Sequence, residues 1–151
     1  MGAWGFRALE SDTGLDVIDS LQIFFADRDQ LIISEVIEHF RREELLPEEE
    51  LEIDFLYDHT NMVLAELLSE FSDTGKIVFN FMDEKSNEYE RHITKVFYSG
   101  ADIDFLFAQI NDILRPAGEV HETYELWEDS DLFLEWKNHV AGLLVKLKML
   151  R

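Results

Sequence analysis

The sequence predicts an α+β fold in which about five helices pack with a small antiparallel sheet. Hydrophobic residues recur at helical spacing in several long segments. Residues 76–98 instead alternate apolar and polar side chains around a polar loop, which is typical of a β-hairpin. The chain has 151 residues, 46% of them hydrophobic, and no linker-like tract. We therefore expect residues 1–151 to form a single domain around one core.

Two helices are expected in the first 45 residues. Ser11 or Asp12 is a suitable N-cap for the first, whose apolar residues continue at helical spacing to about Asp27. Asp29 is a suitable cap for the second. The apolar face of this second helix is formed by Ile32, Ile33, Val36, Ile37 and Phe40.

A third helical segment follows Pro47, which suits the first turn of a helix. Asp58 is a second suitable cap, so we expect a break in the helix near that residue. The apolar period then continues to Phe71, and Gly75 is the expected C′ residue.

The second half of the chain mixes strands and helices. Residues 76–82 and 91–98 are expected to pair as a hairpin. A helix is expected between Gly100 and Pro116, and a further strand at residues 119–126. Ser130 or Asp131 is expected to begin a terminal helix.

The chain is strongly acidic, with a formal net charge of -20 from 33 Asp and Glu against 13 Lys and Arg. Residues 1–75 hold 19 of the acidic residues but only 4 of the basic ones. Such a surface repels the phosphates of nucleic acids and anionic lipids, so we expect neither as a partner. A basic protein is the partner class that this charge favours.

One acidic block lies beside apolar residues that could anchor a partner. It contains Glu43, Glu44, Glu48, Glu49, Glu50, Glu52 and Asp54. Leu45, Leu46, Leu51, Phe55 and Leu56 flank it. We interpret the block as a candidate docking surface, although a solvated helix start explains the same residues.

His121 is the histidine with the strongest case for metal binding. In a strand over residues 119–126, Glu119, His121 and Glu125 would point to the same side. Carboxylate and imidazole groups suit Zn²⁺ or Mn²⁺. However, Glu119 and Glu125 would lie roughly 20 Å apart in such a strand, at about 3.3 Å per residue. We therefore favour a solvated strand face over a metal site and expect no cofactor.

The sequence lacks the motifs of thiol-based, phosphate-binding and His-Glu-x-x-His metal sites. There is no cysteine, which excludes a thiol nucleophile and a disulfide framework. The seven glycines form no phosphate-binding loop, and no His-Glu-x-x-His spacing occurs. Acidic residues interrupt the first twenty positions, and no apolar run is long enough for a membrane span. We expect a cytoplasmic protein that is not an enzyme.

The sequence opens with Gly2-Ala3-Trp4-Gly5, in which two glycines give the backbone around Trp4 conformational freedom. We expect Trp4 to tuck between helices and to anchor the N-terminus. This opening, followed by Leu9-Glu10-Ser11-Asp12, resembles a family of small uncharacterised bacterial proteins that begin with Gly-Ala-Trp-Gly. Related chains carry labels as molybdate-metabolism regulators or as immunity proteins of toxin systems. A molybdate site needs cationic or hydroxyl donors, which this acidic chain supplies poorly.

These observations lead to three functional hypotheses. The first is a non-enzymatic interaction protein, such as an immunity protein that binds a basic partner. The second is a regulatory or structural protein that acts by self-association, with a homodimer as one form. The third is a metal-dependent enzyme that uses His121.

Overall fold

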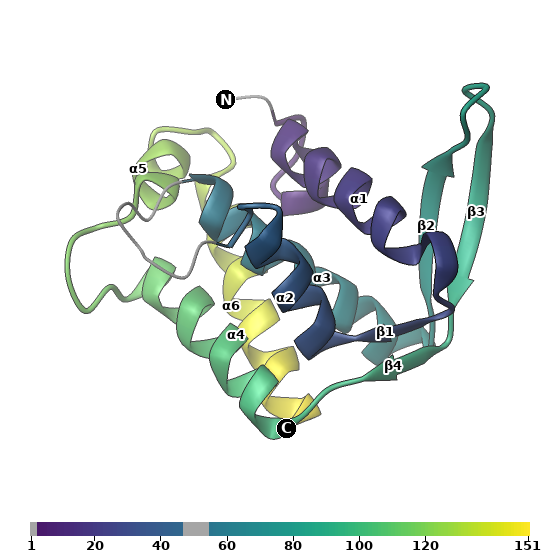
Figure 1. Ribbon diagram of the computed structural model, residues 1–151. Helices are drawn as coiled ribbons and strands as arrows, with labels where there is room; N and C mark the ends of the chain where they lie inside the picture. The colour runs from purple at the N-terminus through teal and green to yellow at the C-terminus, as the bar shows by residue number, and fades with distance from the viewer. Residues whose placement is uncertain (1–2, 47–54) are drawn as a thin grey trace.

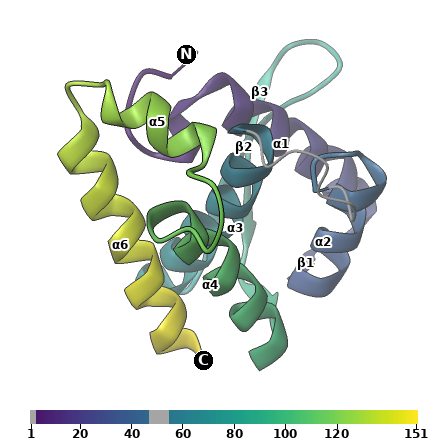
Figure 2. The ribbon, with the colours of Figure 1, turned by 90° about the vertical axis from the view of Figure 1, so that its left-hand side faces the viewer.

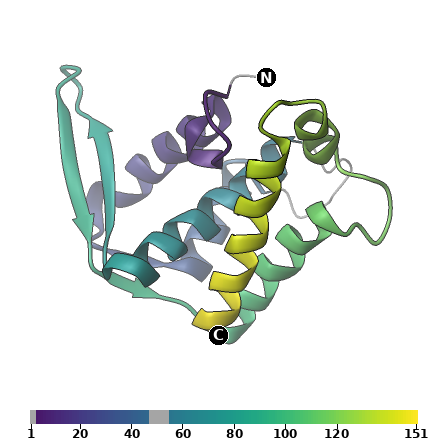
Figure 3. The same cartoon turned by 180° about the vertical axis from the view of Figure 1, so that it is seen from behind.

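The computed structural model describes residues 3–46 and 55–151, and the α+β prediction is confirmed. In that part of the chain, six α-helices accompany two small two-stranded sheets. Helix α3 (Phe55–Thr74) runs through the centre, and helices α1, α4 and α6 pack against it (Figure 1). Helices α4 and α6 lie side by side in Figures 1 and 3.

The first helix is found where the sequence predicts it. Helix α1 (Asp12–Phe24) begins at Ser11, whose side-chain oxygen accepts a hydrogen bond from the Gly14 amide. A 3-10 turn, η1 (Ala8–Glu10), precedes it, and a second, η2 (Phe25–Asp27), extends it to the predicted end.

The second helix begins later than predicted, because the residues after Asp29 pair as a strand. Strand β1 (Gln30–Ile32) runs parallel to β4 (Lys95–Phe97), with Leu31 opposite Val96. Helix α2 (Ile33–Arg42) follows directly. Asp29 therefore does not cap this helix, and the parallel pair ties the first third of the chain to the middle.

Helix α3 passes through Asp58 without the predicted break. Asp58 is buried in its first turn, as are nearly all side chains from Tyr57 to Leu68. The predicted start at Pro47 lies outside the described residues. The predicted end is confirmed, because Gly75 follows the helix with a positive φ of 79°.

The hairpin is confirmed, although its second strand is shorter than predicted. Strand β2 (Ile77–Met82) pairs antiparallel with β3 (Glu88–Ile93). Ile77, Phe79 and Phe81 point into the core. The chain then leaves the hairpin to form β4, so the predicted strand over 91–98 is divided between two sheets. Figure 2 shows the hairpin loop reaching beyond the helices.

The predicted strand over residues 119–126 is wrong. Helix α5 (Glu122–Glu128) occupies this segment and buries Thr123 and Trp127, which are four residues apart. Trp127 stacks on Trp136 of helix α6 (Phe133–Leu150), with ring centroids 5.9 Å apart. Packing of one helical face therefore overrides the apparent alternation of residues 119–126. Helix α4 (Gly100–Leu114) and the terminal helix are confirmed, although the terminal helix begins at Phe133 and not at Ser130 or Asp131 as expected.

Candidate functional site

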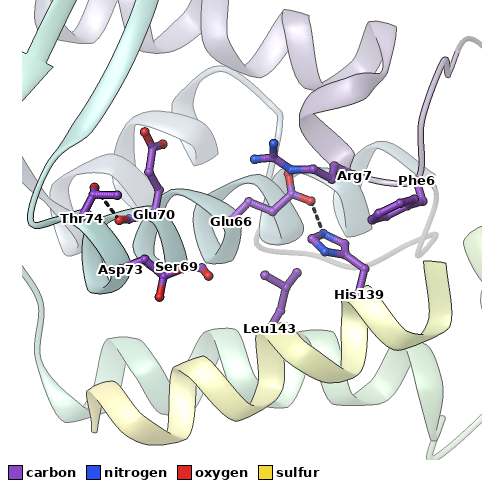
Figure 4. Close-up of a pocket in the computed structure, with 9 residues that line it drawn as sticks. All are labelled: Phe6, Arg7, Glu66, Ser69, Glu70, Asp73, Thr74, His139 and Leu143. Atoms are coloured by element: carbon purple, nitrogen blue, oxygen red, sulfur yellow. Dashed lines mark hydrogen bonds and ion pairs between the residues drawn. The ribbon is translucent and has the colours of Figure 1, made fainter. Parts of the chain in front are cut away.

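A pocket of about 460 Å³ lies where the N-terminal segment meets helices α3 and α6 (Figure 4). Its walls combine charged, polar and apolar side chains: Phe6, Arg7, Glu66, Ser69, Glu70, Asp73, Thr74, His139 and Leu143. Figure 4 shows Glu66 and His139 reaching toward each other from the two helices. The pocket therefore combines titratable groups from distant parts of the sequence.

Glu66 is the polar centre of this region. Its carboxylate is buried and accepts hydrogen bonds from two backbone amides, those of Ala8 at 2.7 Å and Leu9 at 2.9 Å. Nε2 of His139 lies 2.7 Å from the same carboxylate. A buried carboxylate with three donors is well satisfied. Glu66 thus connects the N-terminal segment, α3 and α6.

The remaining carboxylates of the pocket also have protein partners. Asp73 forms an ion pair with Lys146, and Glu70 accepts a 3.3 Å hydrogen bond from the Val78 amide. Phe6 covers one side of His139, with ring centroids 5.4 Å apart. The polar groups are therefore used to join elements of the fold, and Arg7 is the exposed cation at the rim.

The N-terminus is anchored by its backbone rather than by Trp4. The indole of Trp4 is 59% exposed, so the expected insertion between helices is wrong. The Trp4 amide donates to the Glu10 carbonyl at 3.0 Å, and Ala3 bridges to Ser11. Together with the two amides that Glu66 binds, these contacts fold the opening segment against the start of α1.

His121 has a different environment from the one predicted. It is the N-cap of α5 and is buried between two carboxylates. Nδ1 lies 2.9 Å from Asp58 and Nε2 lies 2.6 Å from Asp112. The hydrogen bond to Asp58 and the second bond to Asp112 outweigh burial and raise the pKa of His121 to about 9. His121 is therefore a buried imidazolium at neutral pH.

The structure does not bring the proposed metal ligands together. Glu119 and Glu125 are exposed, and the strand that was to align them with His121 is a helix. Among residues 3–46 and 55–151, no group of three or more His, Asp or Glu side chains is arranged to hold a metal ion. His121 instead takes part in a hydrogen-bonded contact between α3, α4 and α5.

The predicted acidic block is only partly described. Glu43 and Glu44 are exposed directly after α2, and Glu44 has a positive φ of 61°. The rest of the block, Glu48, Glu49, Glu50, Glu52 and Asp54, lies outside the described residues. The block therefore stays a sequence-based candidate for partner binding.

Sequence reasoning missed Glu66, Asp58 and Asp112. One signal was present for Glu66, because it interrupts the apolar run from Met62 to Leu68. A single charge within such a run requires a buried partner. That partner is 73 residues away, at His139, so the sequence alone does not identify it.

Within the described residues, no helix has the length and apolar character needed to cross a membrane. A family model described as a domain of unknown function, DUF4259, matches residues 2–139. No curated protein and no solved structure matches the chain. The matched region begins at Gly2 and includes Glu66, His121 and His139. The resemblance expected from the first twenty residues is thus confirmed and covers most of the chain.

Proposed function

The chain belongs to the DUF4259 family, and we propose that it is a non-enzymatic acidic protein that binds a basic protein partner. The observation that carries this proposal is a surface on which exposed carboxylates surround exposed apolar side chains. We call it the α1–hairpin face. It consists of Asp12, Leu15, Asp16, Asp19, Ile23 and Tyr89.

Helix α1 supplies the carboxylates. Asp12, Asp16 and Asp19 are exposed and follow one another at i, i+4 and i+7, so they lie along one side of the helix. The helix contains no lysine or arginine. Its outer side therefore presents a row of negative charge without neutralisation from within the helix.

The same face carries apolar anchors. Ile23 is 68% exposed, and Leu15 and Tyr89 are exposed as well. The Gln22 side chain donates to the Met82 carbonyl oxygen and, at 3.2 Å, to the Tyr89 hydroxyl. These contacts place the end of α1 against the hairpin, as Figures 1 and 3 also show. Protein interfaces combine such an apolar centre with a polar rim.

The charge of the whole chain supports a basic partner. The hairpin carries further exposed carboxylates, Glu84, Glu88 and Glu90, and those of Glu88 and Glu90 are on its other side from Tyr89. A negative field of this kind attracts cationic proteins, accelerates their association and weakens in salt. The apolar side chains would then add contacts that salt does not screen.

The specific function that we propose is neutralisation of a toxin, in which the basic partner is the toxin itself. Toxins that act on nucleic acids need lysine and arginine residues to bind phosphate. An acidic protein that covers such residues competes directly with the nucleic acid. The α1–hairpin face offers the complementary charge, and its apolar anchors supply affinity beyond electrostatic attraction.

Affinity capture from a lysate of the source organism, at low and at high salt, tests the proposal. We expect one basic protein to be retained at about 0.05 M salt and largely released at about 0.5 M, because screening shortens the range of charge attraction. A chain with Asp16→Lys and Asp19→Lys should not retain it. Retention of no basic protein, or equal retention by that variant, would contradict the proposal.

A further inference from the structure

A groove between helices α4 and α6 differs in charge from the rest of the molecule. It has a volume of about 430 Å³. Its apolar floor includes Phe107, Leu144 and Val145, and its charged lining residues are Arg115 and Lys148. The groove is thus cationic and apolar, on a chain whose formal net charge is -20. We call it the α4–α6 groove.

The cations of the groove are available to a partner. Arg115 is exposed and donates to the Asn111 side chain at 3.1 Å, and the Lys148 ammonium lies 5.4 Å from the centre of the Phe107 ring. Within the described residues, no carboxylate lies at ion-pair distance from either cation. Among residues 3–46 and 55–151, neither cation is therefore held in an ion pair.

The outer side of α6 adds exposed apolar area to the groove. Val145 is 59% exposed and Met149 is 68% exposed, although both belong to a helix that packs its other side into the core. Single exposed apolar residues are ordinary in proteins. Two of them one turn apart, beside an apolar groove with unpaired cations, are instead typical of a protein contact.

We propose that the α4–α6 groove binds the outer side of helix α1 from a second copy of this chain. The two surfaces are complementary. Helix α1 offers the exposed row Asp12, Asp16 and Asp19 beside Leu15, and the groove offers Arg115 and Lys148 beside Val145. This self-association is independent of any basic partner, although it uses part of the α1–hairpin face.

The spacing of the charges fits this contact. Asp12 and Asp19 are seven residues apart, which is about 10 Å along a helix. Lys148 lies beside Phe107, and the Arg115 guanidinium binds the Asn111 side chain, one helical turn, or about 6 Å, further along α4. The two cations therefore follow one another along the groove, so that both can contact the row of carboxylates on α1.

Charge also selects how the copies are arranged. A symmetric contact between two α4–α6 grooves would place Arg115 and Lys148 near their own copies, and two α1 helices would repel each other through their aspartates. The favoured contact is therefore head-to-tail, between different surfaces of the two copies. Such a contact leaves one groove and one α1 helix unused, so association continues as concentration rises.

Sedimentation velocity of the protein alone, from low to high micromolar concentration in about 0.15 M salt, tests this proposal. At this ionic strength the Debye length is about 8 Å, which screens repulsion between the net charges but leaves pairs in contact effective. We expect the weight-average sedimentation coefficient to rise with concentration. A coefficient that stays at the monomer value throughout would overturn the proposal.

Charge-reversal variants identify the surfaces. Arg115→Glu with Lys148→Glu should weaken association at least tenfold, whereas Lys76→Glu with Lys85→Glu makes the same change in net charge at other exposed positions and should weaken it far less. Asp12→Lys with Asp19→Lys lowers the net negative charge of the chain. If repulsion between the net charges of the copies controlled association, this variant would associate more strongly than the wild type. The proposed contact predicts that it associates more weakly, because the variant lacks two carboxylates of the contact. Circular dichroism checks that each variant is folded.

A mixture provides the complementary test. The groove variant and the α1 variant should each remain monomeric, and their equimolar mixture should associate, because each supplies the surface that the other lacks. If the mixture stays monomeric while the wild type associates, or if both variants associate like the wild type, the proposed contact is wrong. None of these measurements needs a partner, so their failure is distinct from failure of the proposed function.

Discussion

Glu66 and His139 lie 2.7 Å apart, on helices α3 and α6, and the same carboxylate binds the amides of Ala8 and Leu9. One buried side chain thus joins three parts of the chain that are remote in sequence. We expect Glu66→Ala to lower the free energy of unfolding by roughly 3–5 kcal/mol, because it leaves the buried Ala8 amide, the half-buried Leu9 amide and the His139 imidazole without their acceptor.

Urea denaturation of Glu66→Ala, His139→Ala and the double variant measures how strongly the two side chains depend on each other. The two single losses should add up to more than the loss in the double variant. Strict additivity would show that Glu66 acts through the amides alone.

The backbone of the N-terminal segment approaches α1 most closely at Gly14. A Cβ atom at this position would lie 2.1 Å from the Ala8 carbonyl oxygen. We expect Gly14→Ala to cost roughly 2–3 kcal/mol despite the better helix propensity of alanine, because backbone has to move. Thermal unfolding measures the change.

Gly142 of α6 is the matched control for Gly14. A Cβ atom there meets nothing within 4 Å, so Gly142→Ala should raise stability by about 0.5–1 kcal/mol. Equal effects of the two substitutions would contradict the tight approach of Ala8 to Gly14.

The exposed position of Trp4 leads to a further prediction. Trp4→Ala should change the free energy of unfolding by no more than about 0.5 kcal/mol, since the indole is mostly in solvent. Phe6→Ala should cost about 1–2 kcal/mol, because Phe6 packs on His139. A large loss on replacement of Trp4 would favour the buried indole that the sequence predicted.

The raised pKa of His121 predicts a loss of stability at alkaline pH. The folded protein holds this proton more tightly than the unfolded chain, whose histidine pKa is near 6.5. The stabilisation is therefore complete below about pH 6.5 and is lost as pH rises through about 9. A tenfold difference in proton affinity corresponds to about 1.4 kcal/mol, so the full loss of stability is on the order of 3 kcal/mol.

Unfolding in urea between pH 6 and pH 10 tests this dependence, with His121→Gln as the reference. The glutamine variant should be less stable at pH 6, and the difference between the two proteins should shrink toward pH 10. A constant difference across this range would mean that the His121 charge does not contribute to stability.

Local patterns were sufficient to predict most of the helices and the hairpin. Helix α4 illustrates why, since its apolar period begins after Gly100 and ends before Pro116, close to the observed boundaries. Strand β1 and its parallel pairing with β4 escaped prediction, because β1 has only three residues and its partner lies more than 60 positions away. Helix α5 was misread because burial of Thr123 and Trp127, rather than local alternation, decides its structure.

The candidate sites were less predictable than the fold. The solvated strand face expected for His121 was wrong, because its neighbours in space, Asp58 and Asp112, come from two other helices and bury it. The α1–hairpin face and the α4–α6 groove likewise depend on which side chains remain exposed after packing. Net charge is the basis for expecting a basic partner, whereas the positions of the two proposed surfaces required the structure.

The most direct test of the proposed docking surface is the affinity of the retained basic protein for four forms of the chain. We expect Asp16→Lys with Asp19→Lys to weaken binding at least tenfold, and Glu125→Lys with Glu128→Lys, an equal charge change on α5, to weaken it far less. The form with Glu48, Glu49 and Glu50 changed to lysine tests the predicted acidic block. Loss of affinity only in that last form, or equal affinity of the wild type and the α1 variant, would contradict binding through the α1–hairpin face.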